Sequence, residues 1–171
     1  MSFPLSARCR LPVAILVTFA TSAWALEESV DVINATPTDL ATVNVAADGD
    51  GVNIGQLESG IPKPQHSALP SGQMTAQPGG VTVSDHATKV AGVMLSQDAM
   101  HTGVAPAANL FSASISASNT GGRDGDVIKA GDWLVSQNIK VLNMSNGGSG
   151  SIDGTSRETI YADWLASTRD S

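Results

Sequence analysis

Residues 85–94 read Asp-His-Ala-Thr-Lys-Val-Ala-Gly-Val-Met and place a histidine at the start of a helix of small residues. Asp85 is expected to cap this helix, because its carboxylate can accept hydrogen bonds from the free N–H groups of the first turn. Apolar residues then recur at helical spacing, which predicts a helix over residues 86–97. His86 lies near the positive end of the helix dipole, which favours the neutral imidazole that a general base requires.

Gly92 stands inside this predicted helix, where glycine costs up to about 1 kcal/mol relative to alanine. A glycine at such a position is typical of a helix that another backbone segment approaches closely. We therefore expect a neighbouring backbone segment to pass against Gly92.

The run from His86 to Gly92 resembles the histidine region of the subtilisin-like serine proteases, or subtilases, which reads His-Gly-Thr-His-Val-Ala-Gly. Five of the seven positions agree, and the departures are Ala87 and Lys89. By this resemblance His86 is the general base of a catalytic triad. The alternative reading of the residues alone is a histidine that caps the helix or belongs to the core.

A second segment, residues 51–60, predicts a short strand over 52–57 that ends in Glu58, serine and glycine. It resembles the subtilase strand that ends in Asp-Ser-Gly, whose aspartate orients the catalytic histidine. Glu58 keeps the carboxylate and adds one methylene, so the resemblance implies that Glu58 orients His86. A solvated turn glutamate is the alternative. Asp48 and Asp50 precede the strand and are expected at its wrong end.

A third segment, residues 140–148, is an apolar strand followed by a glycine-containing turn. It resembles the subtilase segment Val-Ile-Asn-Met-Ser-Leu-Gly, whose end binds the substrate backbone as an added antiparallel strand. By this resemblance Ser145, Asn146 and Gly147 line the substrate cleft. The alternative is a core strand that ends in a glycine turn.

The order of elements predicts an α/β fold, a parallel sheet with helices on both faces, subtilisin-like and truncated. Strands are expected near 52–57, 110–115 and 140–145, and helices near 86–97, 126–137 and 156–167. Ligand sites in such sheets lie beyond the carboxyl ends of the strands, which is where Glu58, His86 and Ser145 converge. Four further expectations concern single elements: residues 61–83 form a surface loop with a solvated His66, His101 is a linker residue, Asp126 caps the helix near 126–137, and Thr155 caps the last helix.

The first residues of the chain are typical of a targeting segment. Arg8 and Arg10 precede an apolar run at 11–20, and Ala23-Trp24-Ala25 fits the small-x-small pattern of a cleavage site. This predicts a signal peptide over 1–25, cleavage after Ala25, and a secreted or periplasmic protein without a membrane span. Residues 26–50 are expected to form a leader or edge segment. Residues 51–171 are expected to be the N-terminal part of a subtilase catalytic domain.

The composition excludes several classes of function. Removal of two arginines with the signal peptide leaves 7 basic and 16 acidic residues, a formal charge of −9, which argues against nucleic-acid partners. The one cysteine, Cys9, lies in the predicted signal peptide, so the chain that remains after cleavage is expected to have no thiol catalyst. No Gly-x-Gly-x-x-Gly motif follows the first strand, so a nucleotide site is not expected. No metal or other cofactor is expected, although a structural calcium ion is compatible with the Asp/Gly turn at 48–51.

The resemblance implies a secreted serine endopeptidase that acts on polypeptide substrates, but the nucleophile is not found. In subtilases it stands in Gly-Thr-Ser-Met-Ala, at the start of a helix far downstream. Residues 154–156 read Gly-Thr-Ser but precede Arg157 and Glu158, so we assign this serine to the capping region of a helix. The chain alone is therefore expected to be inactive. The alternative is a non-catalytic secreted peptide-binding module, a pseudoprotease.

Overall fold

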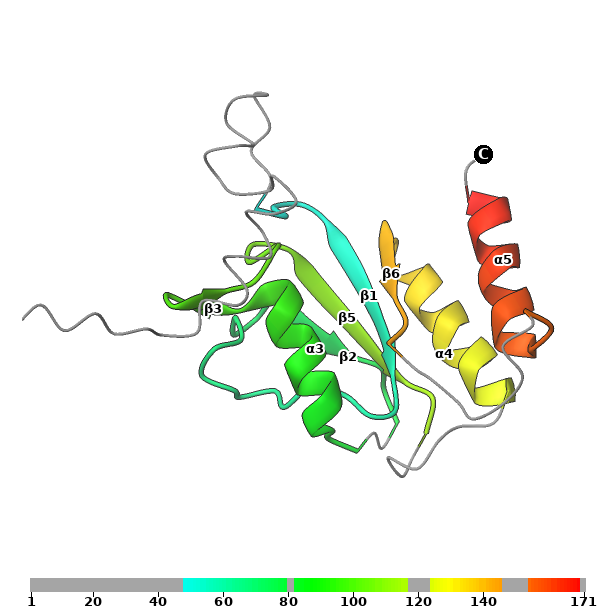
Figure 1. The fold of residues 1–171 in the computed structure, drawn as a ribbon, viewed down its shortest axis with the longest axis horizontal. Helices are drawn as coiled ribbons and strands as arrows, with labels where there is room; N and C mark the ends of the chain where they lie inside the picture. Colours follow the sequence, from blue (N-terminus) through cyan, green and yellow to red (C-terminus); the bar gives the residue numbers. More distant parts are fainter. Residues whose placement is uncertain (1–47, 80–81, 117–123, 146–153, 170–171) are drawn as a thin grey trace, which may run out of the picture.

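A computed structural model describes residues 48–79, 82–116, 124–145 and 154–169. A four-stranded sheet in the order β2-β5-β1-β6 lies at the centre, and all its pairings are parallel (Figure 1). The elements are β1 (Asn53–Glu58), β2 (Met74–Ala76), α3 (Asp85–Leu95), β3 (Gln97–Asp98), β4 (His101–Thr102), β5 (Asn109–Ser114), α4 (Asp124–Ser136), β6 (Val141–Asn143) and α5 (Arg157–Arg169). The prediction of an α/β fold built on a parallel sheet is confirmed.

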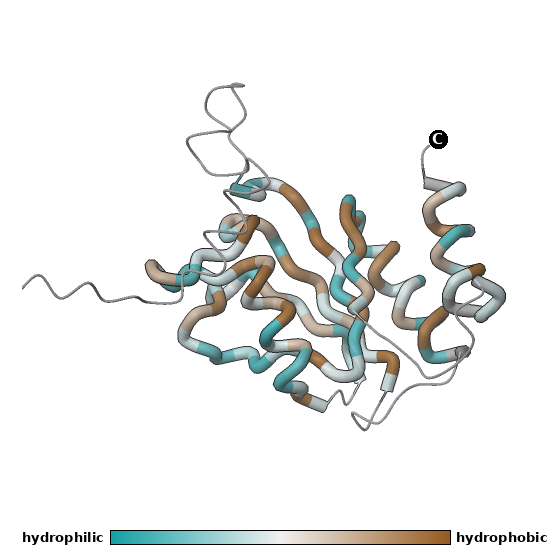
Figure 2. The backbone as a smooth tube through the Cα atoms, in the orientation of Figure 1, coloured by the Kyte–Doolittle hydropathy of each residue, from teal (hydrophilic) through white to brown (hydrophobic). Residues whose placement is uncertain are grey.

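Helices cover both faces of the sheet because the side chains of β1 and β5 alternate between two apolar clusters. Ile54 and Leu110 pack on one face against α3, through Ala91 and Leu95. The other face packs against α4 and α5, and its buried residues are Leu57, Ala113, Ile115, Val127, Ala130, Leu134, Tyr161 and Leu165. Figure 2 shows the hydrophobic residues along β1 and β5, with hydrophilic positions between them on β1.

Helix α3 begins one residue earlier than predicted and has a different cap. Ser84 is extended, and its Oγ accepts from the backbone N–H of Ala87 at 3.3 Å. The prediction that Asp85 caps the helix is therefore wrong, since Asp85 is already the first helical residue. Burial of Ala87, Ala91 and Leu95, four residues apart, directs one stripe of α3 toward the sheet.

The prediction for Gly92 is also wrong. Among the described residues, a Cβ atom at Gly92 would meet no atom within 4 Å, so no backbone of this part of the chain passes against it. The close approach occurs at Gly103, where a Cβ would lie 2.6 Å from the backbone nitrogen of Ser96 and 2.7 Å from that of Leu95. Gly103 donates its N–H to the Ser96 carbonyl at 2.7 Å, which holds the chain against the end of α3.

Residues 61–83 are more than the surface loop that was predicted. They contain β2, which pairs with β5, and Leu69, which is buried in the cluster beneath α3. A strand of three residues at the edge of a sheet shows too little alternation to be recognised in a sequence. The antiparallel pair β3–β4 was not predicted for the same reason. His101 lies in this pair and not in a linker.

The starts of the other two helices also differ from the predictions. Helix α4 begins at Asp124, so Asp126 lies inside it. Helix α5 begins at Arg157, and Ser156 Oγ accepts from the N–H of Thr159 at 3.2 Å. Ser156 is therefore the cap in place of Thr155, as expected for a side-chain oxygen that bonds the third helical N–H.

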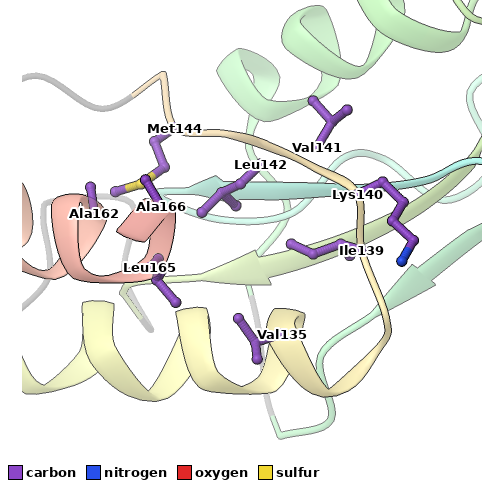
Figure 3. A pocket seen from close by; sticks show the side chains of 9 residues that line it. All are labelled: Val135, Ile139, Lys140, Val141, Leu142, Met144, Ala162, Leu165 and Ala166. Carbon is purple, nitrogen blue, oxygen red and sulfur yellow. The ribbon is translucent and has the colours of Figure 1, made fainter. Parts of the chain in front are cut away.

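Strand β6 is an edge of the sheet among the described residues, and an apolar groove lies beside it. The groove has a volume of about 420 Å³ and lies between β6, α4 and α5 (Figure 3). Its lining includes Val135, Ile139, Leu142, Met144 and Leu165. Val141 on the edge strand is 53% exposed, which shows how incompletely this side of the sheet is covered.

Candidate active site

Glu58 stands at the carboxyl end of β1, at the edge of the sheet where the predictions placed the site. Its residue is 0% exposed. The chain then turns at Gly60, whose φ of 113° is a backbone conformation that only glycine adopts readily. Ile61 pairs with Val83, and Ser84 donates its N–H to the Ile61 carbonyl at 2.9 Å. This short bridge brings the first turn of α3 back beside the strand end.

His86 extends from that first turn toward Glu58. Its Nε2 lies 3.4 Å from Glu58 Oε2, while its side chain is 61% exposed. The distance is that of an ion pair and is longer than a good hydrogen bond. Two residues 28 positions apart in the sequence therefore form an acid–base pair, with the acid buried and the base open to solvent.

Ser145 connects to both members of this pair through its main chain. Its N–H donates to Glu58 Oε1 at 3.2 Å, and its carbonyl oxygen lies 3.1 Å from His86 Nε2. Its hydroxyl accepts from Asn143 Nδ2 at 2.9 Å. The end of β6 is thus tied to the carboxylate and the ring together, and the candidate active site consists of Glu58, His86 and Ser145.

The partners of His86 determine which nitrogen carries a proton. A carbonyl oxygen can only accept, so Nε2 must be the donor toward Ser145. In the neutral ring the lone pair is then on Nδ1, because a neutral imidazole holds one proton. The arrangement can therefore accept a proton at Nδ1 and hold the resulting cation beside a carboxylate.

Burial raises the pKa of the Glu58 carboxyl above its ordinary value, because the charged form loses its hydration. The charge of His86 and the N–H of Ser145 act in the opposite direction and offset part of this shift. The net direction of the pKa change is upward, so the effect of burial outweighs that of the two neighbours.

A row of polar side chains surrounds the pair on the α3 face of the sheet. Gln56 lies two residues before Glu58 and is 0% exposed, and its Nε2 donates to the Ala87 carbonyl at 2.8 Å. Ser112 and Ser114 on β5 are the register partners of Gln56 and Glu58. Sequence reasoning missed Gln56, although a glutamine inside an apolar strand, two positions before the acid, was a visible signal.

The structure brings together three of the predicted site residues, Glu58, His86 and Ser145. Asn146 and Gly147 lie outside the described residues, as do the predicted signal peptide, its cleavage site and the leader up to residue 47. Asp48 and Asp50 lie before β1, at the opposite end of that strand from Glu58. His66 is exposed, and its Nδ1 accepts from the N–H of Ala68 at 3.3 Å.

The described residues contain neither a metal-binding cluster nor a membrane-spanning helix. Across residues 48–79, 82–116, 124–145 and 154–169, no three His, Cys, Asp or Glu side chains gather as a metal site would require. Within the same part of the chain, none of the helices combines the length and the apolar character needed to cross a membrane.

The described part of the chain thus combines a parallel α/β sheet with a carboxylate–histidine pair at the carboxyl edge of that sheet. The family model that matches this chain is the subtilase family, peptidase S8, over residues 49–169, and the chain belongs to that family.

Three solved structures resemble the fold. The CspB protease of Clostridium perfringens matches 79% of this chain with a TM-score of 0.62 at 19% identity. The prenylagaramide maturation protease PagA matches 71% with a TM-score of 0.61 at 22% identity, and a cold-adapted subtilisin-like serine proteinase matches 72% with a TM-score of 0.51 at 28% identity. The matches span only 38%, 44% and 45% of those chains.

Proposed function

We propose that this chain supplies the acid and the base of a secreted serine endopeptidase, with His86 as the general base and Glu58 as the carboxylate that orients it. The observation that carries the proposal is the 3.4 Å contact between His86 Nε2 and Glu58 Oε2 at the carboxyl edge of the sheet. A serine hydroxyl is a weak nucleophile until a neighbouring base takes its proton. A carboxylate beside the base stabilises the imidazolium that this transfer creates.

The tautomer gives the path of the proton in this proposal. Nε2 keeps its proton, which it donates to the Ser145 carbonyl, and Glu58 Oε2 lies 3.4 Å from the same nitrogen. Nδ1 then receives the proton of the attacking serine and later delivers it to the leaving amine. The cation that exists in between is paired with Glu58, so the reaction needs Glu58 in its ionised form.

The nucleophile of this proposal lies outside the 171 residues. Ser156 is a poor candidate because its Oγ caps α5 through Thr159. Removal of the serine from subtilisin, a member of the same family, lowers kcat by about 10⁶ and provides the scale of activity expected for the chain alone. We further propose that Ser145, Asn146 and Gly147 bind the backbone of a polypeptide substrate, that cleavage after Ala25 leads to secretion, and that the reaction uses no cofactor.

The experiment is fluorophosphonate labelling of the natural translation product that contains these residues. We expect covalent labelling of one serine and hydrolysis of casein. His86→Ala should abolish both, whereas His66→Ala, which removes an exposed histidine elsewhere, should leave both unchanged. A natural product that neither reacts with the probe nor cleaves casein would overturn the assignment.

One observation favours a second function, that of a peptide-binding module without chemistry. Glu58 Oε2 is buried and has no hydrogen-bond partner among the described residues, so the acid–base pair is loosely aligned. Lys89 also departs from the family pattern. This alternative predicts that the natural product binds extended peptides in calorimetry yet resists the probe.

A further inference from the structure

We infer that Gln56 is a positioning residue, whose buried amide holds the first turn of α3, and with it the His86 ring, against Glu58. The inference rests on the proposed function of the Glu58–His86 pair. Gln56 joins this pair as a third side chain. Strand β1 then both carries the acid, Glu58, and positions the base, His86.

The contacts of Gln56 provide the first argument. Its Nε2 donates to the backbone carbonyl of Ala87 at 2.8 Å, and Ala87 is the residue directly after His86. Gln56 and Glu58 are two residues apart, so both side chains project from the same face of β1. One strand therefore holds the carboxylate and also fixes the backbone that carries the imidazole.

The exposure of His86 provides the second argument. Because its side chain is 61% exposed, packing does not confine the ring, and its distance from Glu58 depends on where the backbone of the first turn lies. That turn is held from the loop side by Lys63, whose N–H donates to Thr88 Oγ1 at 2.9 Å. Gln56 holds it from the sheet side, so the two bonds clamp the turn between strand and loop.

The free-energy cost of burying Gln56 provides the third argument. Its Oε1 and the Ser112 hydroxyl are both buried without a hydrogen-bond partner in the described part of the chain. These residues are register partners, whereas the pair two positions earlier, Ile54 and Leu110, is apolar. A buried polar group with unused hydrogen-bonding capacity is less favourable than an apolar one. Stability therefore does not explain this glutamine, whereas positioning of His86 does.

The test compares the ring resonances of the three histidines by NMR at one fixed pH, in the 171-residue chain. Glu58→Gln removes the carboxylate beside the His86 ring and should shift the His86 ring resonances. Gln56→Met removes the amide but keeps the charges of Glu58, Asp85 and Lys89, which lie on the two elements around the ring. It should also shift the His86 ring resonances, because the ring moves relative to Glu58, and should add little in a chain that already carries Glu58→Gln.

Gln73→Met is the matched control. Gln73 Nε2 also donates to a backbone carbonyl, that of Ala108 at 2.9 Å, but at the amino end of β5. This variant should leave the His86 ring resonances unchanged, and the ring resonances of His66 and His101 should not respond to any of the substitutions. A Gln56→Met protein that is less stable while its His86 ring resonances match those of the unaltered chain would overturn the inference.

The design separates the two hypotheses. If Glu58→Gln leaves the His86 ring resonances unchanged, the acid–base pair itself is wrong and the proposed function fails. If Glu58→Gln shifts them and Gln56→Met does not, only the positioning role fails.

A measurement on the unaltered chain decides the case in which Gln56→Met does not fold. The side-chain amide protons of Gln56 should exchange with solvent much more slowly than those of the exposed Gln65 and should show a nuclear Overhauser contact to the first turn of α3. Exchange at the rate of Gln65 would contradict the inference.

Discussion

Two glycines of the α3 region, Gly92 and Gly103, should respond to alanine substitution in opposite directions. At Gly92 the added Cβ meets nothing within 4 Å, and alanine is the better helix former, so Gly92→Ala should stabilise the fold by up to about 1 kcal/mol. At Gly103 the Cβ would lie 2.6 Å and 2.7 Å from backbone nitrogens of α3 and its cap, which cannot move without displacing the helix end. Gly103→Ala should therefore destabilise the fold by about 1–3 kcal/mol, the usual cost of overpacking.

The free energies of unfolding of the two variants should thus differ by about 1–4 kcal/mol. Urea unfolding followed by the fluorescence of Trp133 and Trp164 measures this difference. With a slope of about 1–3 kcal/mol per molar urea, the midpoints should separate by about 0.3 M or more. A Gly103→Ala protein that unfolds at the same urea concentration as the unaltered chain would refute the assignment of the close approach to Gly103. A destabilised Gly92→Ala protein would show that Gly92 is the packed glycine after all.

Two further stability predictions concern the acid and the contact between α4 and α5. Burial raises the pKa of Glu58, so the carboxyl group of Glu58 binds a proton more tightly in the native state than in the unfolded chain. The free energy of unfolding should therefore fall as the pH rises from the ordinary carboxyl range through the raised pKa. Glu58→Gln removes this titration, so its profile of unfolding free energy against pH should be flatter; profiles that run parallel would contradict the burial argument. Tyr161 donates its hydroxyl to Asp132 Oδ1 at 2.8 Å, so Tyr161→Phe should cost about 1–2 kcal/mol in urea unfolding, and an unchanged midpoint would show that the bond contributes nothing.

The sequence was most informative where a local pattern and a local structure coincide. The helix around His86 and the strand before Glu58 each have a periodic apolar pattern, and both were predicted to within two residues at each end. The carboxyl-edge location of Glu58 and Ser145 also followed from the βα order, because parallel strands end at a common edge.

The predictions were wrong where two chemically similar neighbouring residues could each cap the same helix. Ser84 caps α3 in place of Asp85, and Ser156 caps α5 in place of Thr155. Each of these side chains can accept from an N–H in the first turn, so the sequence cannot rank them. The bend of the chain before the helix decides which residue is extended and which is already helical.

The short elements were out of reach for a different reason. Strand β2 owes its existence to pairing with β5, which follows it by more than 30 residues, and to the burial of Leu69 nearby. Three residues carry no periodic signal of their own. Gly103 is a similar case, because its close contact is with a helix that the sequence alone does not place beside it.

From the sequence alone came the order of β1, α3, β5, α4, β6 and α5, the family resemblance, and the choice of Glu58 and His86, because residue type and spacing are local properties. Only the tertiary structure decided that Ser145 bonds both of them through its main chain and that Gln56 reaches the first turn of α3. These contacts join β1, α3 and the end of β6, and their distances depend on how the sheet and helix pack. Packing sums many weak interactions across the whole chain, so no single stretch of sequence encodes it.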